Sequence, residues 1–312
     1  MSYLTLQRGM ELTGSIEDYP EGIVVVVDKP YRWTSADVIR KVKWMAIKHF
    51  HKKNLKVGHA GTLDPLATGV LLVCIGKATK LAETFQKARK QYIAGVTFGA
   101  TTASYDLEKE VDGFCDLGGV SEEALRGVLP SFVGEQDQVA PLFSAKSVDG
   151  VRVYEIARKR YKAGLPVDEL DVLQASRINI YDLSLLSYKE GIPSGRRATL
   201  GNVRGRGPAD RLGGMSGEAA NRFGGDTLLV GQQEIVSKAS SRINVAEVPE
   251  GLPQAEILVD CSKGTYIRAL ARDLGEALGS GAFLHSLRRT KNGGFTVDEA
   301  LDIENLKSIL TI

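Results

Sequence analysis

Cysteine is scarce in this chain of 312 residues, which contains only Cys74, Cys115 and Cys261. The three lie far apart and show no C-x-x-C spacing, and two of them lie in or beside apolar runs typical of strands. This pattern argues against a disulfide framework and against a structural zinc site, and it suits a reducing compartment. We therefore expect reduced thiols and no bound metal.

Long hydrophobic runs are missing as well. No window reaches the roughly 18 apolar residues that a membrane span needs, and Met1 to Asp18 lacks a basic segment followed by a long apolar stretch. We therefore expect a cytoplasmic protein with no membrane partner. With 43% hydrophobic residues, the chain can still bury a sizeable core, as one large domain or two.

Charge is nearly balanced, at a net +2, but it is unevenly placed along the chain. Nine Lys and Arg residues stand against one acid between Lys29 and Lys56, and six stand against two acids between Lys146 and Lys162. By contrast, Tyr105 to Glu123 carries seven acids and one lysine. Separated basic blocks favour a polyanion-binding face, although a solvated helix face explains either block equally well when it is taken alone.

Hydrophobic patterning predicts strands interleaved with helices along most of the chain. A β-branched run predicts a buried strand at 22–28. Thr34-Ser35 offers an N-cap for a helix at 36–49 that has one apolar and one basic side. Further strands are expected at 70–75, 91–98, 177–186, 255–259 and 282–289, and further helices at 78–87, 121–129, 154–161, 261–278 and from 303.

Composition changes sharply after residue 190. Gly191 to Gly231 contains eleven glycines, six arginines and no lysine, and polar sequence continues to about residue 254. Such a segment cannot bury enough apolar surface to offset its ordering entropy, so we expect 191–254 to be a flexible Gly/Arg-rich insertion that joins two neighbouring strands. Its Arg204 to Gly207 element is a weak indication of RNA contact.

The stretch from Val57 to Val70, VGHAGTLDPLATGV, is the strongest candidate for chemistry. It places the Asp64 carboxylate, the His59 imidazole and three glycines in a turn that leads into an apolar run. Glycine permits unusual backbone conformations and Pro65 fixes the chain just after the acid, so Asp64 is held by backbone. The local pattern alone favours a purely structural role, in which Asp64 caps a turn or a helix.

Motifs elsewhere in the chain favour a nucleophile loop. Together with the loop Gly58 to Gly69, they are Lys29-Pro30, Tyr92, the stretch Cys261 to Arg268, and Leu287-Arg288-Arg289. Their combination resembles the TruB family of tRNA pseudouridine synthases over about 22–187 and 255–306. The resemblance is specific because several separated motifs occur in the right order, whereas any one alone is weak.

This resemblance implies an isomerase, an intramolecular transferase that converts the T-loop uridine at tRNA position 55 to pseudouridine. It makes Asp64 the nucleophile, pairs Arg268 with the Asp64 carboxylate, and gives Tyr92 a catalytic role. A carboxylate can hold sugar or base without a metal or cofactor, and the sequence leaves open whether it attacks ribose C1′ or uracil C6. The residues that the resemblance places in substrate binding are His59, Tyr92, Tyr266, Leu287, Lys29 and Lys80.

Reaching a stacked uridine requires flipping it out, at a cost of a few kcal/mol. His59 is expected to fill the vacated space, and Tyr92 or Tyr266 to stack on the extruded base. For Tyr92, at the start of a buried strand, the alternative is an ordinary core side chain.

The fold implied by the resemblance is the α+β pseudouridine synthase fold, a mixed and mostly antiparallel central sheet with flanking helices and a catalytic cleft. We expect a single catalytic domain over 1–312 that acts as a monomer on the T arm of tRNA. Two departures from the family stand out. Only Thr290 to Ile312 follows Arg289, too little for the PUA-type RNA-binding module that members often carry. The segment Thr101 to Ser104 lacks the acid of a Thr-Asp-Thr version.

Two other classes of function compete with this interpretation. A phosphotransferase or hydrolase with an aspartyl-phosphate would need a metal, and Leu66 stands where its usual partner acid would follow Asp64. A non-catalytic tRNA-binding or RNA-folding protein would use the same basic face. An Asp64→Asn variant separates them, because a pure binder would keep its whole function.

Overall fold

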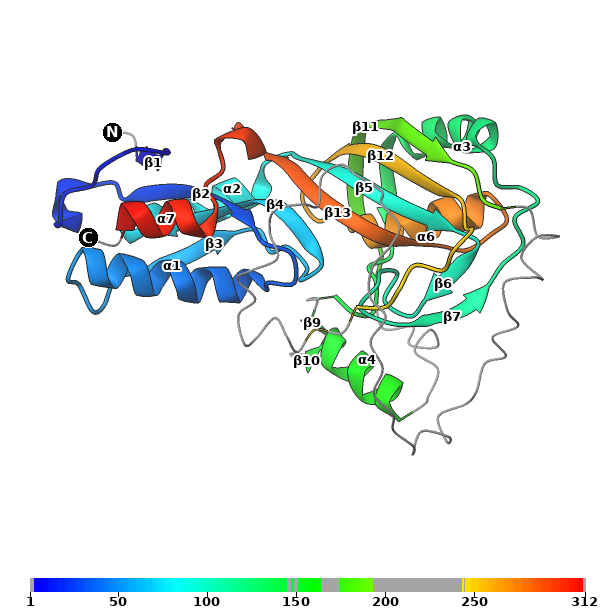
Figure 1. The fold of residues 1–312 in the computed structure, drawn as a ribbon, viewed down its shortest axis with the longest axis horizontal. Helices are drawn as coiled ribbons and strands as arrows, with labels where there is room; N and C mark the ends of the chain where they lie inside the picture. The colour runs from blue at the N-terminus through cyan, green and yellow to red at the C-terminus, as the bar shows by residue number, and fades with distance from the viewer. Residues whose placement is uncertain are drawn as a thin grey trace, which may run out of the picture.

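A mixed sheet of ten strands runs through the part of the chain that the computed structural model describes, residues 3–144, 147–148, 151–163, 174–192, 243 and 245–310. Eight strands form its main path in the order β1-β2-β4-β13-β5-β12-β11-β8, with β3 on β4 and β14 on β13. Among the described strands, only β1 with β2 and β4 with β13 pair in parallel. Figure 1 shows the strands crossing the molecule with helices outside them. This confirms the α+β fold with a mostly antiparallel central sheet.

Six strands of this sheet lie close to the predicted ranges: β2 Ile23–Lys29, β4 Ala67–Ile75, β5 Lys90–Phe98, β11 Ser176–Lys189, β12 Gln254–Cys261 and β13 Ala282–Asn292. The other four, β1 Leu4–Leu6, β3 Val57–Ala60, β8 Gly134–Gln138 and β14 Phe295–Thr296, were not predicted. Two small hairpins stand apart, β6 Ala100–Thr102 with β7 Val111–Phe114, and β9 Ser147–Val148 with β10 Val151–Arg152.

The helices also follow the sequence pattern, except that the helix predicted at 261–278 begins only at Ile267, because Cys261 ends strand β12 and a turn follows it. They are α1 Ser35–His49, α2 Ala82–Lys87, α3 Glu122–Val128, α4 Val153–Lys162, α6 Ile267–Ala277 and α7 Ile303–Leu310, with short 3-10 turns at η1 Ile16–Asp18, η2 Gly76–Leu81, η3 Leu129–Phe132 and η5 Val297–Glu299. The helix predicted at 78–87 is divided between η2 and α2. Among the described residues, none of these helices is long and apolar enough to cross a membrane.

The β-branched strand β2 is buried on both faces because its side chains alternate. Val25 and Val27 belong to the main core, which α1 and α7 cover, whereas Val24 and Val26 lie in smaller clusters with Phe85 of α2. A strand covered on both sides reads as a continuous apolar run, which explains why the prediction at 22–28 was confirmed.

Helix α1 begins as its N-cap sequence predicts. The Thr34 hydroxyl accepts a hydrogen bond from the Asp37 N–H, and the Asp37 carboxylate accepts one from the Thr34 N–H, so two free donors of the first turn are satisfied. Val38, Val42 and Met45 are completely buried. Burial of this stripe fixes which face of α1 points to solvent.

Strands β4 and β13 approach one another so closely that one position requires glycine. Gly69 has φ +97°, and a Cβ built there would lie 2.2 Å from the Arg289 carbonyl oxygen. Neither the conformation nor the space suits a larger residue. This pairing joins the strand after Asp64 to the strand that carries Leu287 and Arg289.

Within the predicted insertion at 191–254, residues 193–242 and 244 lie outside the described residues, including Arg204 to Gly207 and ten of the eleven glycines between Gly191 and Gly231. The strands on either side of it, β11 and β12, pair antiparallel, and the Ile192 N–H donates to the Gly251 carbonyl at 2.9 Å. The segment therefore joins two neighbouring strands, as expected.

Candidate active site

Asp64 lies in a loop at 61–66 between β3 and β4. The predicted turn is too long at its start, because His59 belongs to β3 and pairs with Val73 of β4. Apolar patterning alone could not show this, since Gly58 and Gly61 flank His59 and disfavour a strand. The N–H of Ala67 donates to the Asp64 carbonyl at 3.1 Å and closes the turn.

Three buried side chains, those of Arg289, Ser35 and Lys29, make hydrogen bonds to the backbone of this loop. Arg289, only 1% exposed, donates to the carbonyls of Gly61 at 3.0 Å and Thr62 at 3.5 Å. The Ser35 hydroxyl donates to the Leu63 carbonyl at 3.1 Å and accepts from its N–H at 2.9 Å. These contacts fix the residues on the N-terminal side of Asp64.

Lys29 is the third of these side chains and is completely buried. Its ammonium donates to the carbonyls of Pro30 at 2.8 Å, Trp33 at 2.5 Å and Pro65 at 3.1 Å, which uses all three of its protons. Burial lowers the pKa of Lys29 to about 7, against the opposing effect of the Asp64 and Asp37 carboxylates. Lys29 thus supports the loop from the side opposite to the pocket.

The Asp64 carboxylate pairs with Arg268 of α6, as the resemblance implied. Its Oδ2 lies 2.9 Å from the Arg268 Nε, and the side chains are 41% and 5% exposed respectively. The contact is an ion pair without the alignment of a hydrogen bond. Burial alone would lower the pKa of Arg268, but Asp64 and Asp106 outweigh it and raise that pKa.

Asp106 is a member of this cluster that sequence reasoning missed. Its Oδ2 lies 3.6 Å from the Arg268 Nη1, while its Oδ1 accepts from the Ser104 hydroxyl at 2.5 Å and from the Glu108 N–H at 2.9 Å. Burial raises the pKa of Asp106, and Arg268 opposes that rise. The sequence does contain an aspartate close to the segment Thr101–Ser104, in which the expected acid is missing, because Asp106 follows Ser104 by two residues.

The Arg268 guanidinium is held by carbonyl oxygens as well as carboxylates. Its Nη1 donates to the Ser104 carbonyl at 3.1 Å, and its Nη2 donates to the Phe143 carbonyl at 3.0 Å. A charge that is removed from water must be paired and hydrogen-bonded, and these contacts meet that requirement. These contacts hold the Arg268 guanidinium in place, with its Nε 2.9 Å from the Asp64 Oδ2.

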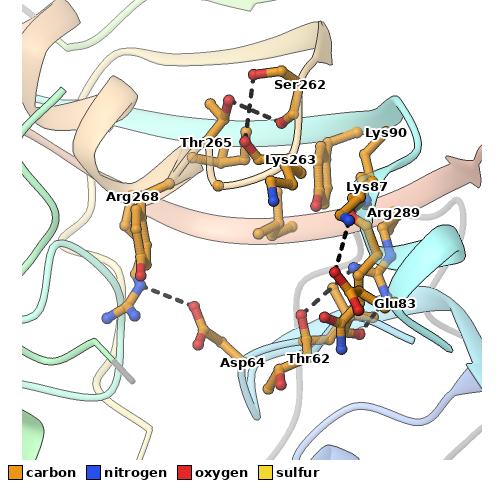
Figure 2. Close-up of a pocket in the computed structure, with 18 residues that line it drawn as sticks. Thr62, Asp64, Glu83, Lys87, Lys90, Ser262, Lys263, Thr265, Arg268 and Arg289 are labelled. Atoms are coloured by element: carbon orange, nitrogen blue, oxygen red, sulfur yellow. Dashed lines mark hydrogen bonds and ion pairs between the residues drawn. The ribbon is translucent and has the colours of Figure 1, made fainter. Parts of the chain in front are cut away.

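A pocket of about 430 Å³ opens above Asp64 and Arg268. Its walls are the loop 61–64, α2 with Lys90, the turn 262–266 that leads into α6, and Tyr92, Leu287 and Arg289. Figure 2 shows Asp64 and Arg268 pointing toward each other at one side, and Glu83, Lys87 and Lys90 at the other. Five cations and two carboxylates line it, so it suits an anionic ligand of nucleotide size.

Tyr92, Tyr266 and Leu287 all line this pocket, so the structure brings them together with Asp64 and Arg268. Burial raises the pKa of Tyr92, which Arg289 opposes, so its phenol is neutral near pH 7. The Gln138 side chain holds the backbone of Tyr266 by accepting from its N–H at 2.8 Å and donating to its carbonyl at 3.2 Å. Two aromatic residues therefore line the pocket wall, and Gln138 fixes the backbone of one of them.

The other three residues of the predicted site lie outside the pocket lining. His59 is half-buried in β3, where burial and Arg289 lower its pKa. Lys80 is exposed in η2, and Lys29 contacts the loop beneath Asp64. Arg289, by contrast, was not among the predicted site residues and appeared only as part of a motif. It nevertheless lines the pocket and donates to the carbonyl of Gly61 in the loop.

Comparison with protein families gives two matches. Residues 48–196 match the sequence model described as TruB family pseudouridylate synthase, N-terminal domain. Residues 268–312 match the one described as tRNA pseudouridylate synthase B C-terminal domain. The two matches contain Asp64, Tyr92 and Arg268.

Among curated proteins, tRNA pseudouridine synthase B of Phocaeicola vulgatus is 37% identical over 288 residues, which cover 92% of this chain and 93% of that protein. The protein of the same name from Parabacteroides distasonis is 35% identical and covers 94% and 95%. That from Clostridium tetani is 31% identical and covers 91% and 72%.

Among solved structures, a chain of a Cbf5-Nop10-Gar1 complex aligns with a TM-score of 0.52 at 22% identity. The alignment covers 93% of this chain and 54% of that one, so the present chain spans about half of its structural neighbour. At this level of identity the likeness concerns the fold.

Proposed function

The chain belongs to the TruB family of pseudouridylate synthases, and from this premise we propose how it isomerises uridine in tRNA. Its relatives named tRNA pseudouridine synthase B cover almost its whole length. The proposal is that the target is the T-loop uridine at position 55 and that Asp64 is the nucleophile.

The observation that carries the proposal is the Asp64 carboxylate. It is 41% exposed, yet an ion pair of 2.9 Å with the buried Arg268 orients it. The other carboxylate of the pocket, Glu83, is 76% exposed and pairs with Lys87 at 2.7 Å. Asp64 therefore combines access to a substrate with a fixed orientation, which a nucleophile requires.

The reaction exchanges one bond for another within the same nucleotide. The N1–C1′ glycosidic bond breaks, a C5–C1′ bond forms, the proton on C5 leaves, and N1 gains a proton. The Asp64 carboxylate can hold the fragment that would otherwise diffuse away, either by attack on ribose C1′ or by addition to uracil C6. Both routes begin with the anion that Arg268 holds in place.

The aromatic residues of the pocket suit an extruded base. Tyr92 and Tyr266 offer faces for stacking, each contributing about 1–3 kcal/mol, and Leu287 supplies an apolar contact. We assign to His59 the space that the uridine leaves in the T loop, and to exposed Lys80 a phosphate contact. Lys29 acts indirectly, by holding the Pro65 carbonyl.

The remaining parts of the proposal concern conditions of action. In this proposal the enzyme works as a monomer on the T arm of tRNA, in the cytoplasm. It needs neither metal nor cofactor, because the carboxylate and the cations of the pocket supply the groups that the bond exchange needs. Activity in the presence of EDTA, on tRNA folded beforehand, tests the independence from metals.

The position is tested on an unmodified tRNA transcript. After incubation with the protein, carbodiimide treatment and primer extension should give a stop one nucleotide to the 3′ side of position 55, and a matched transcript with cytidine at position 55 should give none. A stop at another uridine would contradict the assignment to the T loop. Absence of any stop would contradict the activity itself.

A further inference from the structure

An exposed tryptophan on α1 lies between two lysines. Trp44 is 51% exposed, and the Nζ atoms of Lys41 and Lys48 lie 5.3 Å and 4.7 Å from the centroid of its ring. The lysines stand three residues before and four residues after Trp44, so all three share one face of the helix. Single exposed apolar residues are common, but an indole with an ammonium on either side of it is a specific arrangement.

The charges around Trp44 are available to a ligand. Lys41, Lys43 and Lys48 make no salt bridge to a carboxylate within the described ranges of the chain. Arg40, by contrast, pairs with Asp37. This outer face of α1 therefore offers an aromatic surface and three cations that no described acid neutralises.

The position of Trp44 relates this face to the Asp64 pocket. Ser35, at the start of α1, makes two hydrogen bonds to Leu63, the residue before Asp64. Trp44 follows nine residues later, about 14 Å further along the helix axis. Figure 1 shows α1 leading away from the middle of the molecule. Trp44 does not line the pocket, so it is available to another part of the same RNA.

We propose that Trp44, Lys41 and Lys48 form a stacking platform for an unpaired base of the bound tRNA, outside the nucleotide that enters the Asp64 pocket. The proposal rests on the proposed function, since it takes the tRNA substrate as the ligand. A nucleotide fits the chemistry of the face because it combines a flat π surface with an anionic phosphate. A protein partner fits less well, because lysine is depleted in protein interfaces.

The lysines change partners when the base arrives. In the free protein each ammonium lies over the exposed indole in a cation–π contact. A stacked base binds the ring more strongly than an ammonium does and displaces it. The displaced ammonium then neutralises a phosphate and releases counterions, so the same two residues also add to the salt dependence of binding.

Fluorescence tests contact directly, because the chain has two tryptophans and the other, Trp33, is only 4% exposed. In a Trp33→Phe variant, tRNA should quench Trp44 emission and reduce its quenching by acrylamide. If that variant is unstable, the difference between the wild type and Trp44→Phe gives the same signal. Trp44 emission and acrylamide access that stay unchanged at saturating tRNA would overturn the proposal.

Affinity tests the energy of the stack. Trp44→Leu should weaken tRNA binding about tenfold and Trp44→Phe less, because phenylalanine keeps a flat ring. Lys41→Gln with Lys48→Gln should reduce the slope of log K against log salt by about 1 to 2. Phe114→Leu is the matched control, since Phe114 is 70% exposed with no cation over its ring in the described structure, and it should bind as the wild type does.

Wild-type tRNA affinity in Trp44→Leu would overturn the platform, and it is the result expected if this face binds a protein instead. Failure of the proposed function looks different. In that case the wild-type protein would form no pseudouridine at position 55, whatever the behaviour of Trp44.

Discussion

The Asp64 pocket and the outer face of α1 both carry several cations, yet they hold them in different ways. In the pocket, Arg268 and Arg289 are nearly inaccessible to water, and carbonyls or carboxylates surround them. On α1, Lys43 and Lys48 are exposed and lack a carboxylate partner in the described chain. Burial decides the consequence, because a buried charge orients its neighbours whereas an exposed one mainly attracts an oppositely charged ligand.

This contrast predicts that changes in the pocket alter the chemical step, and changes on α1 alter binding. The largest effect is expected for Asp64→Asn, which keeps the shape of the side chain and removes the anion. Pseudouridine formation should fall at least about 10⁴-fold, while tRNA affinity stays within several-fold. Tritium release from 5-tritiated uridine tRNA under single-turnover conditions measures pseudouridine formation, and filter binding measures tRNA affinity.

The control for this variant is Asp112→Asn, which changes an exposed aspartate of β7 that bonds to Thr101. It should react like the wild type. Robust tritium release by Asp64→Asn would remove the nucleophile assignment. It would also favour the alternative of a tRNA-binding protein whose associated activity resides elsewhere.

Asp106→Asn is expected to have the next largest effect. It removes a buried charge that faces Arg268, so Arg268 loses one of the two carboxylates that hold it. Because Asp106 does not contact the reacting nucleotide in this account, the single-turnover rate at saturating tRNA should fall about 10- to 100-fold with little change in affinity. Equal losses in rate and affinity would instead indicate a general loss of structure.

A smaller effect on the rate is expected from the basic face. Replacing Lys41, Lys43, Lys52 and Lys53 together by glutamine should weaken tRNA binding and flatten its salt dependence by up to about 4 units of slope. Saturating tRNA should recover much of the rate, because the pocket is unchanged. Filter binding across a salt series measures the affinity, and single-turnover kinetics measure the rate. A rate that remains low at saturating tRNA would contradict the claim that these lysines act in binding and the pocket in the chemical step.

The smallest effect concerns acid stability. Burial lowers the pKa of His59 and of His285, and Glu256 opposes the shift at His285. Below pH 6.5 the unfolded chain therefore binds protons that the folded chain resists, so stability decreases as the pH falls. His285→Gln should weaken this dependence by roughly 1–3 °C in Tm between pH 7.5 and 5. His51→Gln, which changes an exposed histidine, serves as the control. If Tm depended on pH in His285→Gln as it does in the wild type, the lowered pKa of His285 would not be a cause of the acid destabilisation.

Much of the fold followed from the sequence because local patterns agree with the final structure. The run of valines in β2, the N-cap at Thr34 and the apolar stripe Ile267, Leu270 and Leu274 each predict an element that is present. The pairing of Arg268 with Asp64 came from the resemblance, since nothing local connects residues so far apart in the chain.

What remained hidden depends on buried charge. Charged side chains are ordinarily assigned to the surface, so neither the complete burial of Lys29 nor the near-complete burial of Arg289 was predicted. Asp106 was missed for the same reason, within a segment rich in exposed acids. The strand β3 was missed because glycine on both sides of His59 outweighs any apolar pattern.

The grip of Arg289 on the loop at 61–66 has a consequence for synthesis of the chain. Arg289 and the Gly61 carbonyl are 228 positions apart, so the loop of Asp64 leaves the ribosome long before the side chain that fixes it. Contacts of such sequence separation form late in folding. A growing chain consequently carries the Asp64 carboxylate in an unfixed loop, and this loop reaches its final position only after residue 289 has been synthesised.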